Sequence, residues 1–250
     1  MSPQTRNAPS VNEPKMDSLA PAPRIVEQVY RAILDAICDG RLAPGERLTQ
    51  ESVAKKLDVS RQPVGQALLL LKQQKFLAEA GRRGLMVAPV DHEFTRWIYE
   101  LRAGIEPIAA SLAARSATVD KVRHGEEIVA QGKSAYDAQT IGELIDADMR
   151  FHMYLYELSG NRLFVDLMGD LWNHLRRAMR EVLNHRDYRP ATWHEHEQIL
   201  HAIATRNPEG AAALARTHVH NATTSLVAQP SIEEPCPGSP SPDDTDPPGS

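Results

Sequence analysis

A carboxylate and an imidazole lie four residues apart in the segment DADMRFHMYLYEL, at Asp148 and His152. Residues four apart on a helix project from the same face. Here that face is the apolar one, because Leu144, Phe151 and Leu155 also fall on it. Burying two such polar groups is costly unless something satisfies them. The spacing leaves two interpretations open: the two side chains pair with each other, or they share a bound cation.

Two later histidines also fall on predicted apolar faces. His196 lies three and four residues before Ile199 and Leu200, and His218 follows Leu214 by four residues. One carboxylate oxygen and three imidazole nitrogens suit zinc, nickel or a similar divalent ion such as manganese, with positions left for water or a ligand. The set that could bind this ion is Asp148, His152, His196 and His218. Three neighbouring histidines are predicted to point elsewhere: His194, His201 and His220. A hydrogen-bonded polar core is the alternative, since ten histidines make chance alignments easy.

Arg102 lies on another predicted apolar face, four residues after Ile98 and three before Ile105. A cation directed into a helical bundle is a candidate for binding an anion there, such as the carboxylate of a small metabolite. The alternative is an ion pair with Glu106, which follows Arg102 by four residues and is therefore its neighbour on a helix.

These candidate residues fall in a region, from His92 to Val227, whose apolar spacing predicts six helices and no strands. Ile108 and Leu167 are expected on the apolar stripes of the first and fourth of these helices. The second helix, from about Val119 to Ala138, has few apolar residues and is expected on the outside. The region is therefore predicted to be an all-α antiparallel helical bundle.

The region before the bundle has the pattern of a winged helix-turn-helix. Helices are predicted at Ile25–Cys38 and Gln50–Leu57, and a third begins after Ser60, which is a good N-cap. The run AGRRGLMV, with a glycine on each side of two arginines, predicts a hairpin. A helix, a short helix, a tight turn, a helix and a basic hairpin make up this motif.

The second helix of such a pair lies in the major groove of DNA. Its first residues, Arg61 and Gln62, are therefore predicted to contact base edges, and the wing arginines, Arg82 and Arg83, to contact phosphates or the minor groove. The charge distribution agrees: residues 24–90 hold eleven basic and seven acidic side chains, a net +4, whereas the whole chain is −5.

Composition divides the mostly α chain into four parts. They are a disordered segment at 1–22, the DNA-binding domain at 23–90, the helical domain with the candidate metal- and anion-binding residues at 91–228, and a disordered acidic tail rich in Pro and Ser at 229–250. The first part lacks the apolar core of a signal peptide. The longest apolar run, Ala67–Leu71, is too short to span a bilayer. We therefore expect a cytoplasmic protein without a membrane partner, and its two cysteines exclude a disulfide framework.

Two stretches of the chain resemble a known family. The run GRLAPGERLTQESVAKKLDVSRQPVGQALLLLKQQKFL, followed by GRRGLMV, resembles the winged-helix domain of the GntR family of bacterial regulators. The segments ELRAGIEPIAASLAA, DADMRFHMYLYELSGN and HEHEQILHAIATRNPEGAAALARTHVHNA resemble the FCD-type ligand domain of its FadR-like branch, in the shorter six-helix form. The resemblance covers about Ile25 to Val227.

The resemblance implies a function. Regulators of this kind are homodimers that bind inverted-repeat operators in double-stranded DNA and release them when a metabolite, often a carboxylic acid, enters the helical domain. It also implies that Arg102 lines the effector cavity. The ligands it implies for a divalent metal are Asp148, His152, His196 and His218.

Two positions depart from the family's pattern. The family places a DNA-contacting Arg at the position of Gly65 and another at the position of Ser52, while Arg61 is retained. A glycine inside a helix also costs about 1 kcal/mol relative to alanine. These departures predict weaker operator binding or different base preferences.

The leading interpretation is thus a transcription regulator that acts as a repressor and responds to a small carboxylic acid at a metal site. The main alternative is a metal-dependent enzyme acting on a small carboxylate, because a metal with open positions can polarise a carbonyl or activate water. The cluster HEHE at 194–197 lacks the H-E-x-x-H spacing of zinc proteases. A metal-stiffened interaction scaffold is a third possibility.

Overall fold

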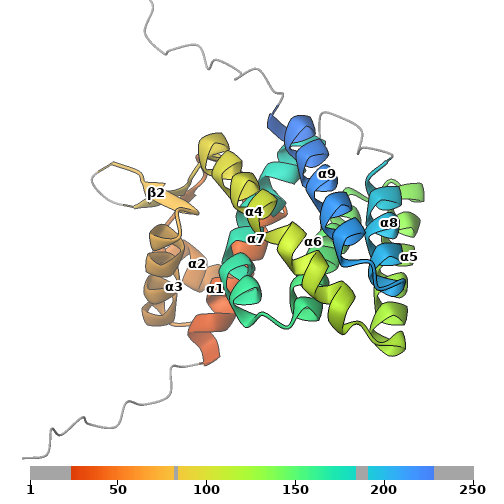
Figure 1. Cartoon of the computed structure of the whole chain (residues 1–250). Helices are drawn as coiled ribbons and strands as arrows, with labels where there is room; N and C mark the ends of the chain where they lie inside the picture. Colours follow the sequence, from red (N-terminus) through yellow and green to blue (C-terminus); the bar gives the residue numbers. More distant parts are fainter. Residues whose placement is uncertain (1–23, 82–83, 184–190, 228–250) are drawn as a thin grey trace, which may run out of the picture. The chain divides into compact units, whose positions relative to one another are not determined.

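The computed structural model describes residues 24–81, 84–183 and 191–227. The predicted disordered segments at 1–22 and 229–250 and the wing residues Arg82 and Arg83 lie outside the described residues. In chain order the elements are α1 (Arg24–Cys38), β1 (Arg47–Leu48), α2 (Gln50–Leu57), α3 (Arg61–Gln73), β2 (Leu77–Glu79), β3 (Leu85–Val87), α4 (His92–Ser116), α5 (Val119–Asp137), α6 (Ile141–Ser159), α7 (Arg162–Leu183), α8 (Thr192–Ala204) and α9 (Pro208–Val227) (Figure 1). Among these residues, no helix is long and apolar enough to cross a membrane.

The chain divides into two compact units. The first contains most of α1 and Arg47–Met86, and the second contains the segment Asp35–Glu46 and everything from Val87 onward. The predicted fold class, a winged helix-turn-helix followed by an all-helical domain, is confirmed.

Local sequence signals explain the helix-turn-helix of the first unit. The Thr49 hydroxyl accepts a hydrogen bond from the Ser52 backbone N–H at 3.1 Å, and the Ser52 hydroxyl accepts one from the Thr49 N–H at 3.3 Å. This reciprocal cap satisfies two N–H groups at the start of α2. Asp58 ends the helix in the left-handed conformation, with φ of 53°, as expected at the sharp turn. Ser52, where the family has an arginine, therefore caps the N-terminus of α2 together with Thr49.

The wing is a small sheet with the strand order β1-β3-β2. The sequence predicts only the β2–β3 hairpin. The additional strand, β1, pairs antiparallel with β3, placing Arg47 opposite Met86. Gly81 and Gly84 have φ values of +70° and +125°, which side-chain-bearing residues rarely adopt. Both glycines therefore have the backbone freedom that the predicted hairpin requires at these positions.

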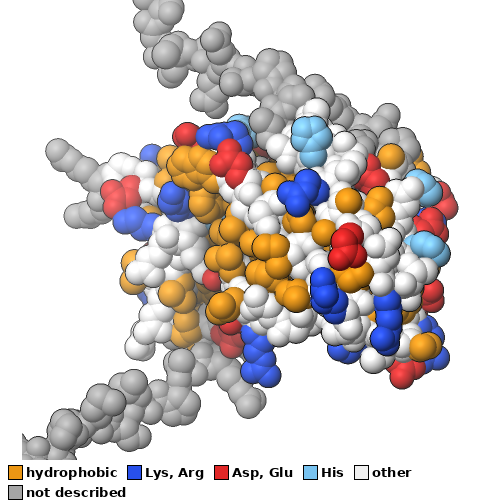
Figure 2. Space-filling view, in the orientation of Figure 1, with side chains coloured by type: hydrophobic (Ala, Val, Ile, Leu, Met, Phe, Trp, Pro, Cys, Tyr) orange, Lys and Arg blue, Asp and Glu red, His pale blue; other side chains and the backbone are white. Residues whose placement is uncertain are grey.

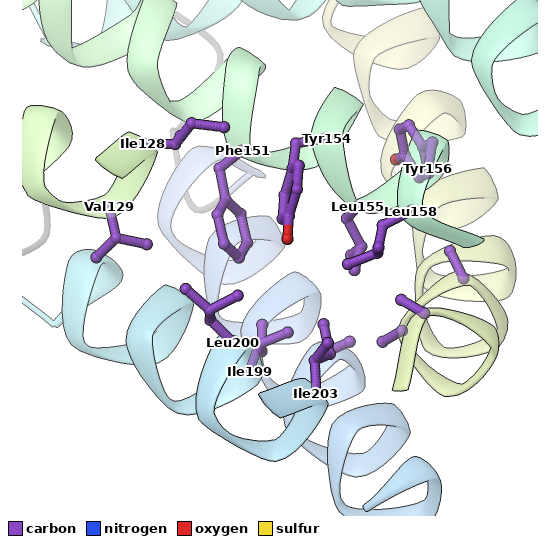
Figure 3. Packing of buried hydrophobic residues seen from close by; sticks show 14 of the residues in the cluster. Ile128, Val129, Phe151, Tyr154, Leu155, Tyr156, Leu158, Ile199, Leu200 and Ile203 are labelled. Atoms are coloured by element: carbon purple, nitrogen blue, oxygen red, sulfur yellow. The ribbon is translucent and has the colours of Figure 1, made fainter. Parts of the chain in front are cut away.

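The second unit is a bundle in which α6 packs against α4, α5 and α7, while α9 packs along α4 and α8. Its six helices, within the described residues, match the predicted number. Phe151 and Leu155 of α6 point toward Ile199, Leu200 and Ile203 of α8 in the core (Figure 3). These apolar contacts fix the relative positions of the helices that carry the candidate histidines.

Two side chains that the spacing places on apolar stripes are exposed. Ile108 on α4 is 53% exposed and Leu167 on α7 is 47% exposed, so their predicted burial is wrong for this chain. Both segments are helices, as their apolar spacing predicts, but α4 and α7 carry wider apolar faces than the neighbouring helices cover.

The helix α5 packs more closely than its few apolar residues suggest. A Cβ added to Gly132 would lie 2.0 Å from Cη2 of Trp193, and one added to Gly125 would lie 2.7 Å from a methyl carbon of Leu200. The missing side chains let α5 approach α8, and they leave room for Trp193, which also contacts His196. The expected outside position of α5 holds for one face only.

We predict that Gly132→Ala destabilises the fold by about 1–3 kcal/mol, because the added methyl overlaps a buried ring. Gly104→Ala is the matched control: Gly104 is also inside a helix, but nothing lies within 4 Å of its added Cβ. That change should stabilise the protein by about 0.5–1 kcal/mol through helix propensity. Urea denaturation of both variants measures the difference. Equal stability of Gly132→Ala and wild type would contradict the close approach of α5 to Trp193.

Candidate metal and effector site

Three buried imidazoles from three helices converge in the second unit. His152 on α6 and His196 on α8 are 0% exposed, and His218 on α9 is 2% exposed. Nε2 of His218 lies 3.3 Å from Nε2 of His196 and 3.3 Å from Nε2 of His152. One ligand atom from each of the three lies within 4.8 Å of the others. The three helices thus bring three imidazole nitrogens close together.

Asp148, one turn before His152 on α6, adds an oxygen to this cluster. Its Oδ1 lies 3.6 Å from His196 Nε2, and its Oδ2 lies 3.8 Å from His152 Nε2. The carboxylate is buried, with 4% of its surface exposed. The structure therefore brings together all four residues that the sequence singles out as possible metal ligands.

The distances that His218 makes suit a tetrahedral ion. Zn–N bonds of about 2.0–2.1 Å at tetrahedral angles place two nitrogens about 3.3 Å apart. The two Nε2–Nε2 distances that His218 makes have this value. Burial lowers the pKa of His152, which keeps its imidazole neutral, the form that binds metals. A donor set of three imidazoles and one carboxylate suits zinc, nickel and related ions.

His218 is oriented by a residue that the sequence analysis missed. Oε2 of Glu195 lies 2.9 Å from His218 Nδ1, and Asn221 donates a hydrogen bond to Glu195 Oε1 at 2.8 Å. With a proton on Nδ1, the lone pair of Nε2 faces the cluster. Carboxylates commonly hold metal-binding histidines in this way. Glu195 directly precedes His196, but no spacing in the sequence links it to His218.

The histidines predicted to point elsewhere are exposed. They are His194, His201 and His220. His194 contacts Gln198 and Glu197 on its own helix. Within α8 and α9, the histidines on one helical face are thus buried and those on the opposite side are exposed.

Arg102 is buried beside the histidine cluster, with 1% of its surface exposed. Its Nε donates to Oε1 of Glu106 at 2.6 Å, so the ion pair considered from the sequence is present. Its Nη2 also lies 2.9 Å from His152 Nε2. The guanidinium carbon is 4.7 Å from the ring centre of Trp172 and 4.9 Å from that of Tyr99. Two aromatic rings and a carboxylate thus hold the cation in place.

Charge compensation explains how a buried carboxylate tolerates this site. Burial raises the pKa of Glu106, but the Arg102 guanidinium and His152 together outweigh it through their charges and hydrogen bonds, and the pKa is held well below its usual range. Burial also disfavours the charged form of Arg102, but Glu106 and its other acidic neighbours together outweigh that effect, so the pKa of Arg102 is raised. Both groups are therefore ionised.

Three buried polar atoms without a hydrogen bond border the cluster. They are Glu106 Oε2, Trp172 Nε1 and Trp193 Nε1. The Trp172 ring stacks on His152 with centroids 5.1 Å apart, and the Trp193 ring meets His196 edge-on at 4.8 Å. A buried group left without a partner costs about 1–3 kcal/mol. A polar ligand bound beside the cluster could form hydrogen bonds with these three atoms.

The candidate DNA-contacting residues lie at the start of α3. The side chain of Arg61 is 66% exposed and forms an ion pair with Glu51 at 3.0 Å, and Gln62 is exposed. Arg82 and Arg83 lie outside the described residues. A Cβ added to Gly65 would lie 3.0 Å from Nε2 of Gln50. The Gln50 amide thus lies where a side chain at position 65 would begin.

Comparison with known proteins gives a consistent result for both units. Residues 25–87 match the family described as bacterial regulatory proteins, gntR family, and residues 97–221 match the FCD domain. An HTH-type transcriptional regulator in an unstable DNA locus of Streptomyces ambofaciens is 31% identical over 193 residues, covering 76% of this chain and 78% of its own. YdhC, an HTH-type transcriptional regulator of Bacillus subtilis (strain 168), is 27% identical over 197 residues, covering 78% of this chain and 87% of its own.

The solved structure of E. coli McbR/YncC has the same fold, with a TM-score of 0.71 at 20% identity over 82% of this chain and 97% of that one. The helix-turn-helix of the gntR family implies DNA binding, and an FCD domain is typically a metabolite-binding domain. The family and the two relatives from Streptomyces ambofaciens and Bacillus subtilis are transcription regulators and not enzymes, so the enzyme alternative has no support. The chain belongs to the GntR family of bacterial transcription regulators and carries an FCD domain after its DNA-binding domain.

Proposed function

We propose that the protein is a repressor that leaves its operator when a small carboxylic acid binds at a metal centre in the FCD domain. The observation that carries this proposal is the convergence of three buried Nε2 atoms and the Asp148 carboxylate next to the buried Arg102. The residues that could bind a metal ion lie next to the buried guanidinium of Arg102. This arrangement suits a ligand whose carboxylate contacts both the ion and the guanidinium.

Asp148, His152, His196 and His218 would hold the metal, with zinc as the first choice and nickel or manganese as the others. When bound, the ion would supply a Lewis acid for a carboxylate oxygen of the effector. Arg102 would face the charge of the same carboxylate, which a guanidinium recognises through paired hydrogen bonds. The unpaired Trp172 N–H is a further donor at this site.

The proposed regulator acts as a homodimer on an inverted repeat, because one winged helix reads a half-site and two-fold symmetry doubles it. The FCD domain has a surface that suits a second copy of the chain. Hydrophobic side chains gather over α4 and α7 (Figure 2), where the exposed ones include Trp97, Ile108, Leu163 and Leu167. Exposed apolar patches of this kind commonly mark interfaces between chains.

Selection of bound sequences from a random DNA pool, with and without a panel of small carboxylic acids, tests this function. We expect enrichment of an inverted repeat in the absence of acid and loss of that enrichment with the correct acid. Enrichment of a single half-site would contradict the dimer, and enrichment unaffected by every acid or by chelation would contradict control through the metal centre.

The same selection with Arg61→Ala tests the recognition helix. Because Arg61 is exposed at the start of α3, its loss should remove sequence discrimination worth about 1–3 kcal/mol, while affinity for unrelated DNA changes little. Lys56→Ala on α2 is a control for the loss of one positive charge from the same domain, and it should leave the enriched sequence unchanged. An unchanged sequence from Arg61→Ala would mean that another element reads the bases.

A further inference from the structure

One carboxylate, that of Glu106, contacts both the candidate anion-binding arginine and a candidate metal ligand. We propose that Glu106 is a positioning residue that couples Arg102 to the metal centre. Binding of an anion at Arg102 then changes the affinity for the metal, and binding of the metal changes the affinity for the anion. The inference rests on the proposed function for the presence of the metal, and it adds a residue and a route of regulation to it.

The contacts of Glu106 carry the argument. Oε1 accepts hydrogen bonds from Arg102 Nε at 2.6 Å and from the Tyr156 hydroxyl at 2.8 Å. Oε2 lies 3.2 Å from Nδ1 of His152 and has no hydrogen bond in this arrangement. Glu106 is 0% exposed, so water does not separate these groups. If Nδ1–H of His152 donates to Oε2, its Nε2 carries no proton and is available to the metal.

Arg102 is in turn placed to affect the metal-binding nitrogen. Its Nη2 lies 2.9 Å from Nε2 and 3.3 Å from Nδ1 of His152, so the positive charge of the guanidinium opposes a metal ion bound at this ring. Glu106 holds the Nε side of the guanidinium and restricts its approach to the ring. An effector carboxylate that draws Arg102 away from His152 would therefore strengthen metal binding, and a bound metal would release Arg102 for the effector, since coupling between two sites is reciprocal.

Glu195 provides an internal comparison. It holds Nδ1 of His218 at 2.9 Å, as Glu106 approaches Nδ1 of His152, and its other oxygen accepts from Asn221 instead of an arginine. Each carboxylate thus lies beside an Nδ1 atom of the histidine cluster, and the two differ in their link to Arg102. If Glu106 acts as proposed, only its replacement changes how Arg102 influences the metal.

Zinc affinity of the full-length protein, measured by competition with a chromogenic chelator, tests the coupling without an effector. Glu106→Gln and Glu195→Gln should each weaken zinc binding by about 10-fold to 100-fold, as expected for carboxylates behind metal ligands. Arg102→Met should recover part of the lost affinity in the Glu106→Gln background, because the substitution removes a positive charge that opposes the ion at His152 and that no carboxylate at position 106 neutralises. In the Glu195→Gln background, by contrast, Arg102→Met should change zinc affinity by the same factor as it does in the wild type, to within about twofold.

The outcomes separate this inference from the proposed function. A wild-type protein that binds no zinc, nickel or manganese contradicts both. Zinc binding by the wild type together with purely multiplicative effects of Glu106→Gln and Arg102→Met contradicts the coupling alone. If Glu106→Gln does not fold, as judged by circular dichroism, nitrogen-15 spectra of the zinc-loaded wild type decide the matter. A proton on Nδ1 of His152 and the metal on Nε2 support the inference, and the reverse assignment overturns it.

Discussion

Replacing His196 or His218 with alanine should reduce bound metal from about one ion per chain to a small fraction of that. Each side chain is buried and directs Nε2 into the cluster, so each removal takes away one ligand of the proposed centre. Metal bound only by the folded state stabilises it, by about 2.7 kcal/mol when the free metal is 100 times its dissociation constant. Elemental analysis and thermal denaturation of the purified variants, with and without added zinc, measure both effects.

The exposed histidines are matched controls for this experiment. His194→Ala and His220→Ala remove the same chemical group from the same two helices, but both residues are exposed, so metal content and melting temperature should stay at the wild-type values. Asp148→Asn should also lose metal, since the amide keeps the shape but not the charge, and His152→Ala should behave like the other ligand variants. Loss of metal from the two control variants equal to that from His196→Ala and His218→Ala would disprove the assigned centre. A metal-free wild type that binds no added ion would leave the four residues as a hydrogen-bonded polar core.

Arg102→Met should weaken binding of the effector acid by about tenfold to a hundredfold, which corresponds to the loss of a charge-assisted hydrogen bond of about 1.5–3 kcal/mol. Methionine keeps much of the apolar stem between the Trp172 and Tyr99 rings but carries no charge. Isothermal titration of the zinc-loaded protein with the acid found in the DNA selection measures the change. DNA binding in the absence of acid should be unaffected, because α3 lies in the other compact unit.

Arg96→Met is the control for this prediction. Arg96 lies on the same helix, nearly two turns before Arg102, and forms surface ion pairs with Glu93 and Glu100. It should therefore change effector affinity little. An effector affinity of Arg102→Met equal to that of the wild type removes Arg102 from the binding site, and the ion pair with Glu106 would then be its whole role.

Features that depend on neighbours along the chain were predictable from the sequence. The spacing of Asp148 and His152 places both on one helical face, whatever the rest of the fold does. The same holds for the turn at Asp58, whose left-handed backbone is tolerated by aspartate. Helix periodicity also separates His196 from His194, because successive residues on a helix rotate by about 100°.

Features that depend on contacts between distant segments were decided only by the tertiary structure. Glu106 and Glu195 meet histidines 46 and 23 positions away, and no local period encodes such a pairing. The strand β1 exists because β3 offers it backbone partners, and α5 approaches α8 because Gly132 leaves space for a tryptophan from another helix. The exposure of Ile108 follows from which faces the other helices cover. A sequence pattern fixes the direction of a side chain on its own helix, whereas its partners depend on how the helices pack.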